Sequence, residues 1–127
     1  MIEFSVVIPV YNGSSSIERL VESLKENLKG FKFETVLIND GSKDNSGEIC
    51  KKIALSTENV KFINLRKNFG EFNAVMCGLN HVQGKYTVII DDDFQNPPSE
   101  ILKLLKTAKE NDFDVVYSYY ESKKHHW

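Results

Sequence analysis

The chain has 127 residues, of which 41% are hydrophobic and 27% are charged, and its formal net charge at pH 7 is −2. This size and composition fit a single globular domain with one core. The slightly acidic balance argues against a nucleic-acid partner, because nucleic-acid modules normally carry a basic patch or stripe. Two cysteines without metal-ligand spacing, and no apolar run approaching about 20 residues, favour reduced thiols, a cytoplasmic location and no membrane helix in this sequence.

Short apolar segments alternate with amphipathic segments along the chain. The apolar segments, which we predict to be buried strands, cover residues 3–10, 33–39, 60–65, 87–90 and 114–119. Helical spacing of apolar residues follows each of the first four, at about residues 17–28, 45–54, 75–82 and 101–108. Strict alternation predicts an α/β fold, with a parallel sheet, helices on both faces and right-handed crossovers.

The first four predicted strands each end in polar residues. In open α/β sheets, ligands bind outside the carboxyl ends of the strands. A carboxylate there can accept a hydrogen bond from a base or ribose, and a basic side chain can meet a phosphate, so the set suits a nucleoside diphosphate. The residues concerned are Tyr11, Asn12, Asp40, Arg66, Lys67, Asn68, Asp91 and Asp93.

Three consecutive carboxylates, Asp91 to Asp93, follow the fourth strand directly. Adjacent carboxylates raise each other's pKa, and a divalent cation removes the conflict. If the strand stays extended, Asp91 and Asp93 point to one side and Asp92 to the other. We therefore predict that Asp91 and Asp93 bind Mg²⁺ or Mn²⁺, with the Gln95 amide oxygen as a third ligand. The alternative is a solvated acidic turn that favours the dipole of the next helix.

Four segments carry a resemblance to a known family: IPVYNGSSSIERLVESL, INDGSKDNS, LRKNFGEFNAVMCGLNHVQGKY and VIIDDDFQNPPSEI. Together they resemble the nucleotide-binding half of inverting family-two glycosyltransferases. Within that family the sequence is most similar to the polyprenyl-phosphate group, which includes dolichol-phosphate mannosyltransferase. The resemblance covers essentially all of residues 1–127. It implies a Rossmann-like GT-A fold, a UDP- or GDP-sugar donor and a Mg²⁺ or Mn²⁺ cofactor.

The resemblance also implies roles for individual residues. Asp91 and Asp93 match the outer acids of the family's DXD element, which act in catalysis through the metal, and Gln95 matches the glutamine that follows them. The donor-binding positions are Pro9, Tyr11 and Asn12 around the base, Asp40 at the base or ribose, Asp92 within the acidic element, and Lys67, Asn68 and Gly70 in a phosphate-side loop.

The sequence departs from the family pattern at two places in that last loop. Lys67 replaces the usual arginine, and a lysine lacks the planar fork that contacts phosphate through two hydrogen bonds, so Arg66 is the candidate to compensate. Glu71, Phe72 and Asn73 replace a less acidic segment.

The resemblance implies transfer of a sugar to an acceptor, for which a polyprenyl phosphate is our first prediction. Such a phosphate is already anionic at neutral pH and needs no strong protein base. A glycan acceptor in cell-surface polysaccharide synthesis is the alternative, and it would need a base, commonly an acid in the family's second half. A noncatalytic nucleotide-binding fragment also remains open.

The chain closes with a polar and aromatic tail, residues 120–127, that predicts no further element. We therefore expect a truncated domain that binds donor weakly or not at all, does not turn over, and self-associates through uncovered apolar surface. Membrane association, at the cytoplasmic face, is expected only through parts outside this sequence.

Two other classes with parallel sheets fit less well. A phosphoacceptor receiver domain places its acids after the first and third strands, whereas here acids follow the second and fourth. A dinucleotide-binding domain needs Gly-x-Gly-x-x-Gly after the first strand, and residues 10–15 lack it.

Overall fold

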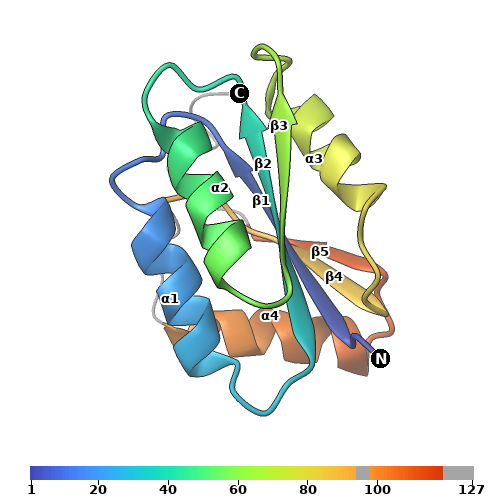
Figure 1. The fold of residues 1–127 in the computed structure, drawn as a ribbon. Helices are drawn as coiled ribbons and strands as arrows, with labels where there is room; N and C mark the ends of the chain where they lie inside the picture. The colour runs from blue at the N-terminus through green and yellow to red at the C-terminus, as the bar shows by residue number, and fades with distance from the viewer. Residues whose placement is uncertain (94–97, 119–127) are drawn as a thin grey trace.

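The computed structural model describes residues 1–93 and 98–118, and within them the fold is a five-stranded sheet with helices on both faces (Figure 1). All strand pairings are parallel, and the strand order is β3-β2-β1-β4-β5. The predicted parallel α/β fold is confirmed. The strands are β1 (Phe4–Val10), β2 (Phe33–Asp40), β3 (Val60–Leu65), β4 (Tyr86–Ile89) and β5 (Val115–Tyr117).

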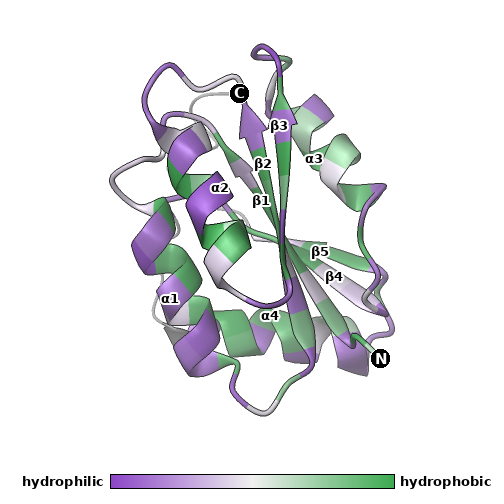
Figure 2. Cartoon of the chain, viewed as in Figure 1, coloured by the Kyte–Doolittle hydropathy of each residue, from purple (hydrophilic) through white to green (hydrophobic). Residues whose placement is uncertain are grey.

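The four helices in the described part of the chain divide unequally between the two faces of the sheet. They are α1 (Ile17–Asn27), α2 (Ser46–Ser56), α3 (Glu71–Leu79) and α4 (Pro98–Glu110). Strand β1 shows the division, because Val6 and Ile8 pack with α1, α2 and α4, whereas Val7 packs with α3. In Figure 2 the helices carry both green and purple segments, as expected for elements with only one side against a core.

The hand of one crossover differs from our expectation. Helices α1 and α4 pack into the same core and contact each other, so they cover the same face. The step from β1 to β2 and the step from β4 to β5 run in opposite directions across the sheet. The two crossovers therefore have opposite hands, and the prediction of right-handed crossovers throughout was wrong. Burial of Ile101, Leu105 and Ala108 of α4 beside α1 stabilises the exception.

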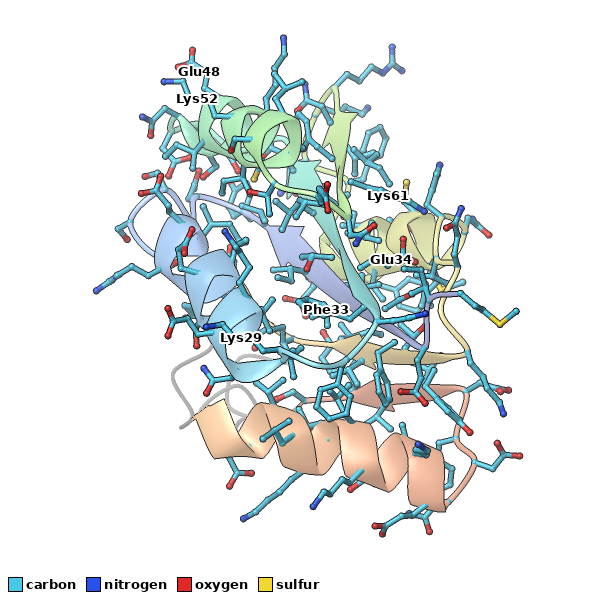
Figure 3. All side chains as sticks on the ribbon, turned by 60° about the horizontal axis from the view of Figure 1, so that its bottom comes forward. Lys29, Phe33, Glu34, Glu48, Lys52 and Lys61 are labelled. Carbon is cyan, nitrogen blue, oxygen red and sulfur yellow. The ribbon has the colours of Figure 1, made fainter. Side chains whose placement is uncertain are left out.

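The amino-terminal ends of the strands are joined around Glu34, a buried acid in β2 (Figure 3). Its carboxylate accepts hydrogen bonds from Ser5 Oγ, at 2.7 Å, and from the Gln83 N–H. Lys61 Nζ lies 2.9 Å from Glu34 Oε1 and also donates to the His81 carbonyl oxygen. These contacts connect β1, β2 and β3 to the turn between α3 and β4.

In the sheet β4 lies beside β1, although β1 is the first strand along the chain and β4 is the fourth. Their carboxyl ends, which carry Pro9 and Tyr11 on one side and Asp91 to Asp93 on the other, therefore lie at one edge. In open α/β sheets this edge is where ligands bind.

Candidate functional site

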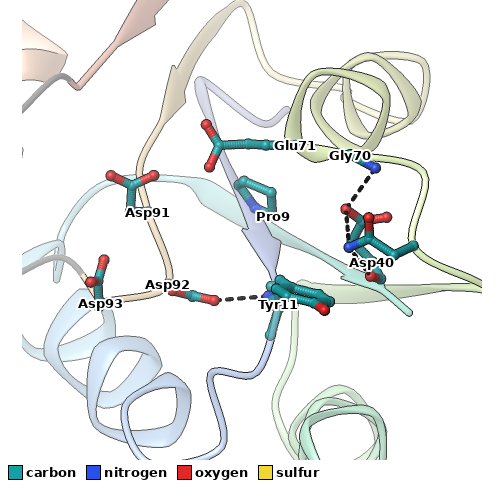
Figure 4. A pocket seen from close by; sticks show the side chains of 10 residues that line it. Pro9, Tyr11, Asp40, Gly70, Glu71, Asp91, Asp92 and Asp93 are labelled. Carbon is teal, nitrogen blue, oxygen red and sulfur yellow. Dashed lines mark hydrogen bonds between the residues drawn. The ribbon is translucent and has the colours of Figure 1, made fainter. Parts of the chain in front are cut away.

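A cavity of about 320 Å³ lies at the carboxyl ends of β1, β2 and β4 (Figure 4). Most of the site residues predicted from the sequence line it, and the structure adds Val10 and Glu71. The lining residues are Pro9, Val10, Tyr11, Asp40, Asn68, Gly70, Glu71, Asp91, Asp92 and Asp93.

Asp92 connects the end of β4 to the loop that follows β1, beside this cavity. Its Oδ2 accepts a hydrogen bond from the Tyr11 N–H at 2.9 Å, and its carbonyl oxygen accepts one from Ser16 Oγ at 2.8 Å. Gly13 packs directly against the Asp92 carboxylate, and a Cβ atom added there would lie 2.8 Å from Asp92 Oδ2. The first loop is therefore held against the acidic segment.

The acidic segment is not extended, contrary to our expectation. Strand β4 ends at Ile89, and Asp92 and Asp93 lie in a turn. All three aspartates line the cavity, and the Asp92 carboxylate points to the Tyr11 N–H, whereas the carboxylates of Asp91 and Asp93 extend in another direction. The assignment of Asp91 and Asp93 as metal ligands stays a prediction.

Asp91 and Asp93 differ in their exposure to solvent. Asp91 is buried, with 2% of its surface exposed, whereas Asp93 is exposed. Gln95 lies outside the described residues. Within the described part of the chain, no three His, Cys, Asp or Glu side chains are placed to hold a metal ion together. Two carboxylates nevertheless fit Mg²⁺ or Mn²⁺, which usually take one or two carboxylates together with waters and substrate phosphates.

Asp40 is buried at the end of β2, and its carboxylate organises the loop before α3. Oδ1 accepts the Phe69 N–H at 2.8 Å, and Oδ2 accepts the Gly70 N–H at 3.1 Å. Asn68 Nδ2 donates to the carbonyl oxygen and to Oδ2 of Asp40. Gly41 has a φ of 64° and packs on the backbone of this loop, where a Cβ atom would overlap it.

Three residues that the sequence analysis placed at the donor site do not line the cavity: Asn12, Arg66 and Lys67. Arg66 is exposed. Asn12 connects two loops, since its Oδ1 accepts the Lys43 N–H at 2.8 Å and its own N–H donates to Ser42 Oγ. Lys67 Nζ lies 5.1 Å from the centroid of the Phe69 ring, in a cation–π arrangement. The donor-binding roles of Asn12 and Lys67 stay predictions.

Glu71 is the acidic lining residue that sequence reasoning did not assign to the site. It is the first residue of α3, and its Oε2 accepts a hydrogen bond from the Tyr117 hydroxyl of β5 at 2.6 Å. Burial raises the pKa of Tyr117, and the hydrogen bond to Glu71 and the charges of Glu71 and Asp91 raise it further. The sequence signals for Glu71 were its position directly after Gly70 and the departure from a less acidic family segment.

The cavity wall is strongly acidic. Five of its lining residues are Asp or Glu, and among the described residues that line it there is no Lys, Arg or His. From these described residues a phosphate-bearing ligand would meet only like charge, unless a cation entered with it.

Comparison with known proteins fixes the family. The sequence profile of Glycosyl transferase family 2 matches residues 5–125. The chain belongs to this family. This membership removes the receiver and dinucleotide-binding alternatives, and the structural similarities below establish the GT-A fold.

Relatives and solved structures agree with that assignment. The undecaprenyl-phosphate 4-deoxy-4-formamido-L-arabinose transferase of Photorhabdus laumondii is 43% identical over 115 residues, which cover 88% of this chain and 35% of the relative. The structure of S. aureus TarS 1–349 with UDP-GlcNAc has a TM-score of 0.70 at 25% identity, covering 87% of this chain and 32% of that chain of residues 1–349. Mannosyltransferase PcManGT from Pyrobaculum calidifontis, solved with GDP-Man and Mn²⁺, has a TM-score of 0.72 at 20% identity and shares the fold over 84% of this chain and 32% of its own.

The chain spans a little over a third of the length of the curated relatives that it matches. Within residues 1–93 and 98–118, no helix combines the length and apolar character needed to cross a bilayer.

Proposed function

We propose that residues 1–127 form the nucleotide-sugar-binding half of an inverting glycosyltransferase. The donor is a UDP- or GDP-sugar, the cofactor is Mg²⁺ or Mn²⁺, and the acceptor is a polyprenyl phosphate. The observation that carries the proposal is the cavity at the strand ends, whose acidic wall has no basic lining residue among those described. A diphosphate can be held against such a wall when a divalent cation lies between them.

Asp91 and Asp93 are the residues that would hold the cation. When bound, the ion supplies charge stabilisation to the departing diphosphate. The remaining residues shape the site. Asp92 fixes the Tyr11 backbone, and Asp40 fixes the loop that carries Asn68 and Gly70 into the wall. Pro9 and Tyr11 then form the side against which the nucleoside packs.

The acceptor assignment is supported by the name of the Photorhabdus laumondii relative, which acts on undecaprenyl phosphate. A phosphate acceptor is a nucleophile without proton removal at neutral pH, so it requires no base from these residues. Transfer of labelled sugar to undecaprenyl phosphate, and not to a soluble oligosaccharide, by the longest form of the protein that contains this segment tests the acceptor.

The donor is tested by calorimetric titration of the purified chain with UDP and with GDP, each with Mn²⁺ and with a chelator. The sequence left weak donor binding and no binding both open, and the proposal commits to the first. It predicts that the chain binds one of the two nucleotides weakly and only in the presence of the metal. Equal binding of both nucleotides with and without metal, or no binding in any condition, would contradict it.

A further inference from the structure

Glu71 carries a charge that the family resemblance did not assign to the site. Glu71 lines the cavity, and its Oε2 accepts a hydrogen bond of 2.6 Å from the hydroxyl of Tyr117 in β5. The bond connects the start of α3 with the strand beside β4, from which the acidic segment continues. Figure 4 shows Glu71 projecting over Pro9 on the side of Asp91.

An acid in the first turn of a helix is favourable on its own, because it interacts with the helix dipole. Helix α2 has such an acid in Glu48, which is exposed and does not line the cavity. Glu71 differs from Glu48 because a hydroxyl from another element fixes its direction, and because four aspartates share its cavity. The helix dipole therefore accounts for an acid at this position but not for its placement in the wall.

The charge of Glu71 affects free and metal-bound nucleotides differently. A free diphosphate entering this cavity is repelled by every carboxylate of the wall, whereas a divalent cation bound to it cancels most of its charge. The fixed carboxylate also attracts the cation. Both effects favour the metal complex over the free nucleotide.

We propose that Glu71, positioned by Tyr117, makes the donor site selective for the metal-bound form of the nucleotide. This inference rests on the proposed function, because it presupposes that the cavity receives a nucleoside diphosphate. Tyr117 acts through Glu71 and is a positioning residue.

The test compares Glu71→Gln with the unchanged chain in titrations with UDP and GDP, in EDTA and in saturating Mn²⁺. Removing the charge is expected to strengthen binding of metal-free nucleotide about tenfold and to change binding with Mn²⁺ less than about threefold. A loss of structure would weaken both, so a gain in EDTA has no merely structural explanation. Glu48→Gln, the same change in the first turn of α2, should leave both affinities within about twofold.

Tyr117→Phe keeps the charge of Glu71 but removes the hydrogen bond that directs it into the cavity, so the metal-free affinity should rise about threefold, less than in Glu71→Gln. No rise at all would contradict positioning by Tyr117. A gain as large as that of Glu71→Gln would contradict charge as the cause. If the unchanged chain binds neither nucleotide with Mn²⁺, the proposed function fails and this inference fails with it. If it binds but Glu71→Gln gives no gain in EDTA, this inference alone is overturned.

Discussion

The Gly70 N–H donates to Asp40 Oδ2 at 3.1 Å, although the two residues are 30 positions apart in the chain. The contact joins the end of β2 to the residue before α3. With the Phe69 N–H and Asn68 Nδ2 as further donors, the Asp40 carboxylate is largely occupied by hydrogen bonds from the loop before α3. In this structure Asp40 holds the loop that brings Asn68 and Gly70 to the cavity wall.

Asp40→Asn should therefore lower stability as well as nucleotide affinity. An amide can accept from one of the two backbone N–H groups, but its NH₂ group faces the other, so we expect a loss of about 1–3 kcal/mol in the free energy of unfolding. Urea unfolding measures the loss, and the amide NMR signals of Phe69 and Gly70 should shift most. Asp114→Asn, an exposed change outside the cavity, should have little effect. Unchanged Phe69 and Gly70 signals would contradict the role of Asp40.

Gly13→Ala tests the contact between the first loop and the acidic segment. The new Cβ atom would lie 2.8 Å from Asp92 Oδ2, so the Asp92 carboxylate must move away from the Tyr11 N–H. We expect a loss of about 1 kcal/mol in stability and about tenfold weaker binding of the metal–nucleotide complex. Thermal unfolding and calorimetry measure these effects. Ser15→Ala is an exposed change in the same loop and serves as the control. If Gly13→Ala has the same stability and the same affinity for the metal–nucleotide complex as Ser15→Ala, the contact between Gly13 and Asp92 is unimportant.

The strands could be predicted closely from sequence because a strand buried in a parallel sheet is a continuous apolar run. Residues 3–10 were expected for β1, and the strand is Phe4–Val10. The last strand was expected over 114–119, and the structure describes Val115–Tyr117. The hand of the crossover through α4 could not be predicted from the alternation of strands and helices, because it depends on which face of the sheet α4 covers.

The acids of the site were predictable because carboxylates directly after a buried strand must lie at its carboxyl edge. Glu71 was missed because its placement depends on Tyr117, which is 46 residues away. For Asn12 and Lys67 the family pattern gave the position but not the direction of the side chain. Local partners, the Lys43 N–H and the Phe69 ring, turn these two side chains to contacts outside the cavity lining.

The Glu34 network predicts how stability depends on pH. Burial raises the pKa of Glu34, but hydrogen bonds from Ser5, Gln83 and Lys61 outweigh burial and hold it below its ordinary value of 4.5. A carboxyl whose pKa is lower in the folded state stabilises the fold above the unfolded pKa. That contribution is lost as pH falls from about 4.5 through the lower folded pKa.

Glu34→Gln should accordingly reduce stability at pH 7 by about 1–3 kcal/mol and flatten the pH dependence below pH 4.5. Urea unfolding at pH 7 and at steps down to pH 3 measures both effects. Glu22→Gln breaks an exposed pair with Lys25 and should cost less than about 0.5 kcal/mol. If the free energy of unfolding of Glu34→Gln depends on pH as strongly as that of the unchanged chain, Glu34 is not the source of this pH dependence.

The central claim is that the acids after β4 hold a divalent cation together with a nucleotide, and electron paramagnetic resonance of Mn²⁺ tests it most directly. The free Mn²⁺ signal should fall when the chain is added to Mn²⁺ and UDP or GDP, beyond the fall caused by the nucleotide itself. Asp93→Asn should abolish this additional fall, and Asp114→Asn should preserve it. If Asp93→Asn binds Mn²⁺ and nucleotide as the unchanged chain does, or if the chain adds nothing to the binding by nucleotide, the account is wrong.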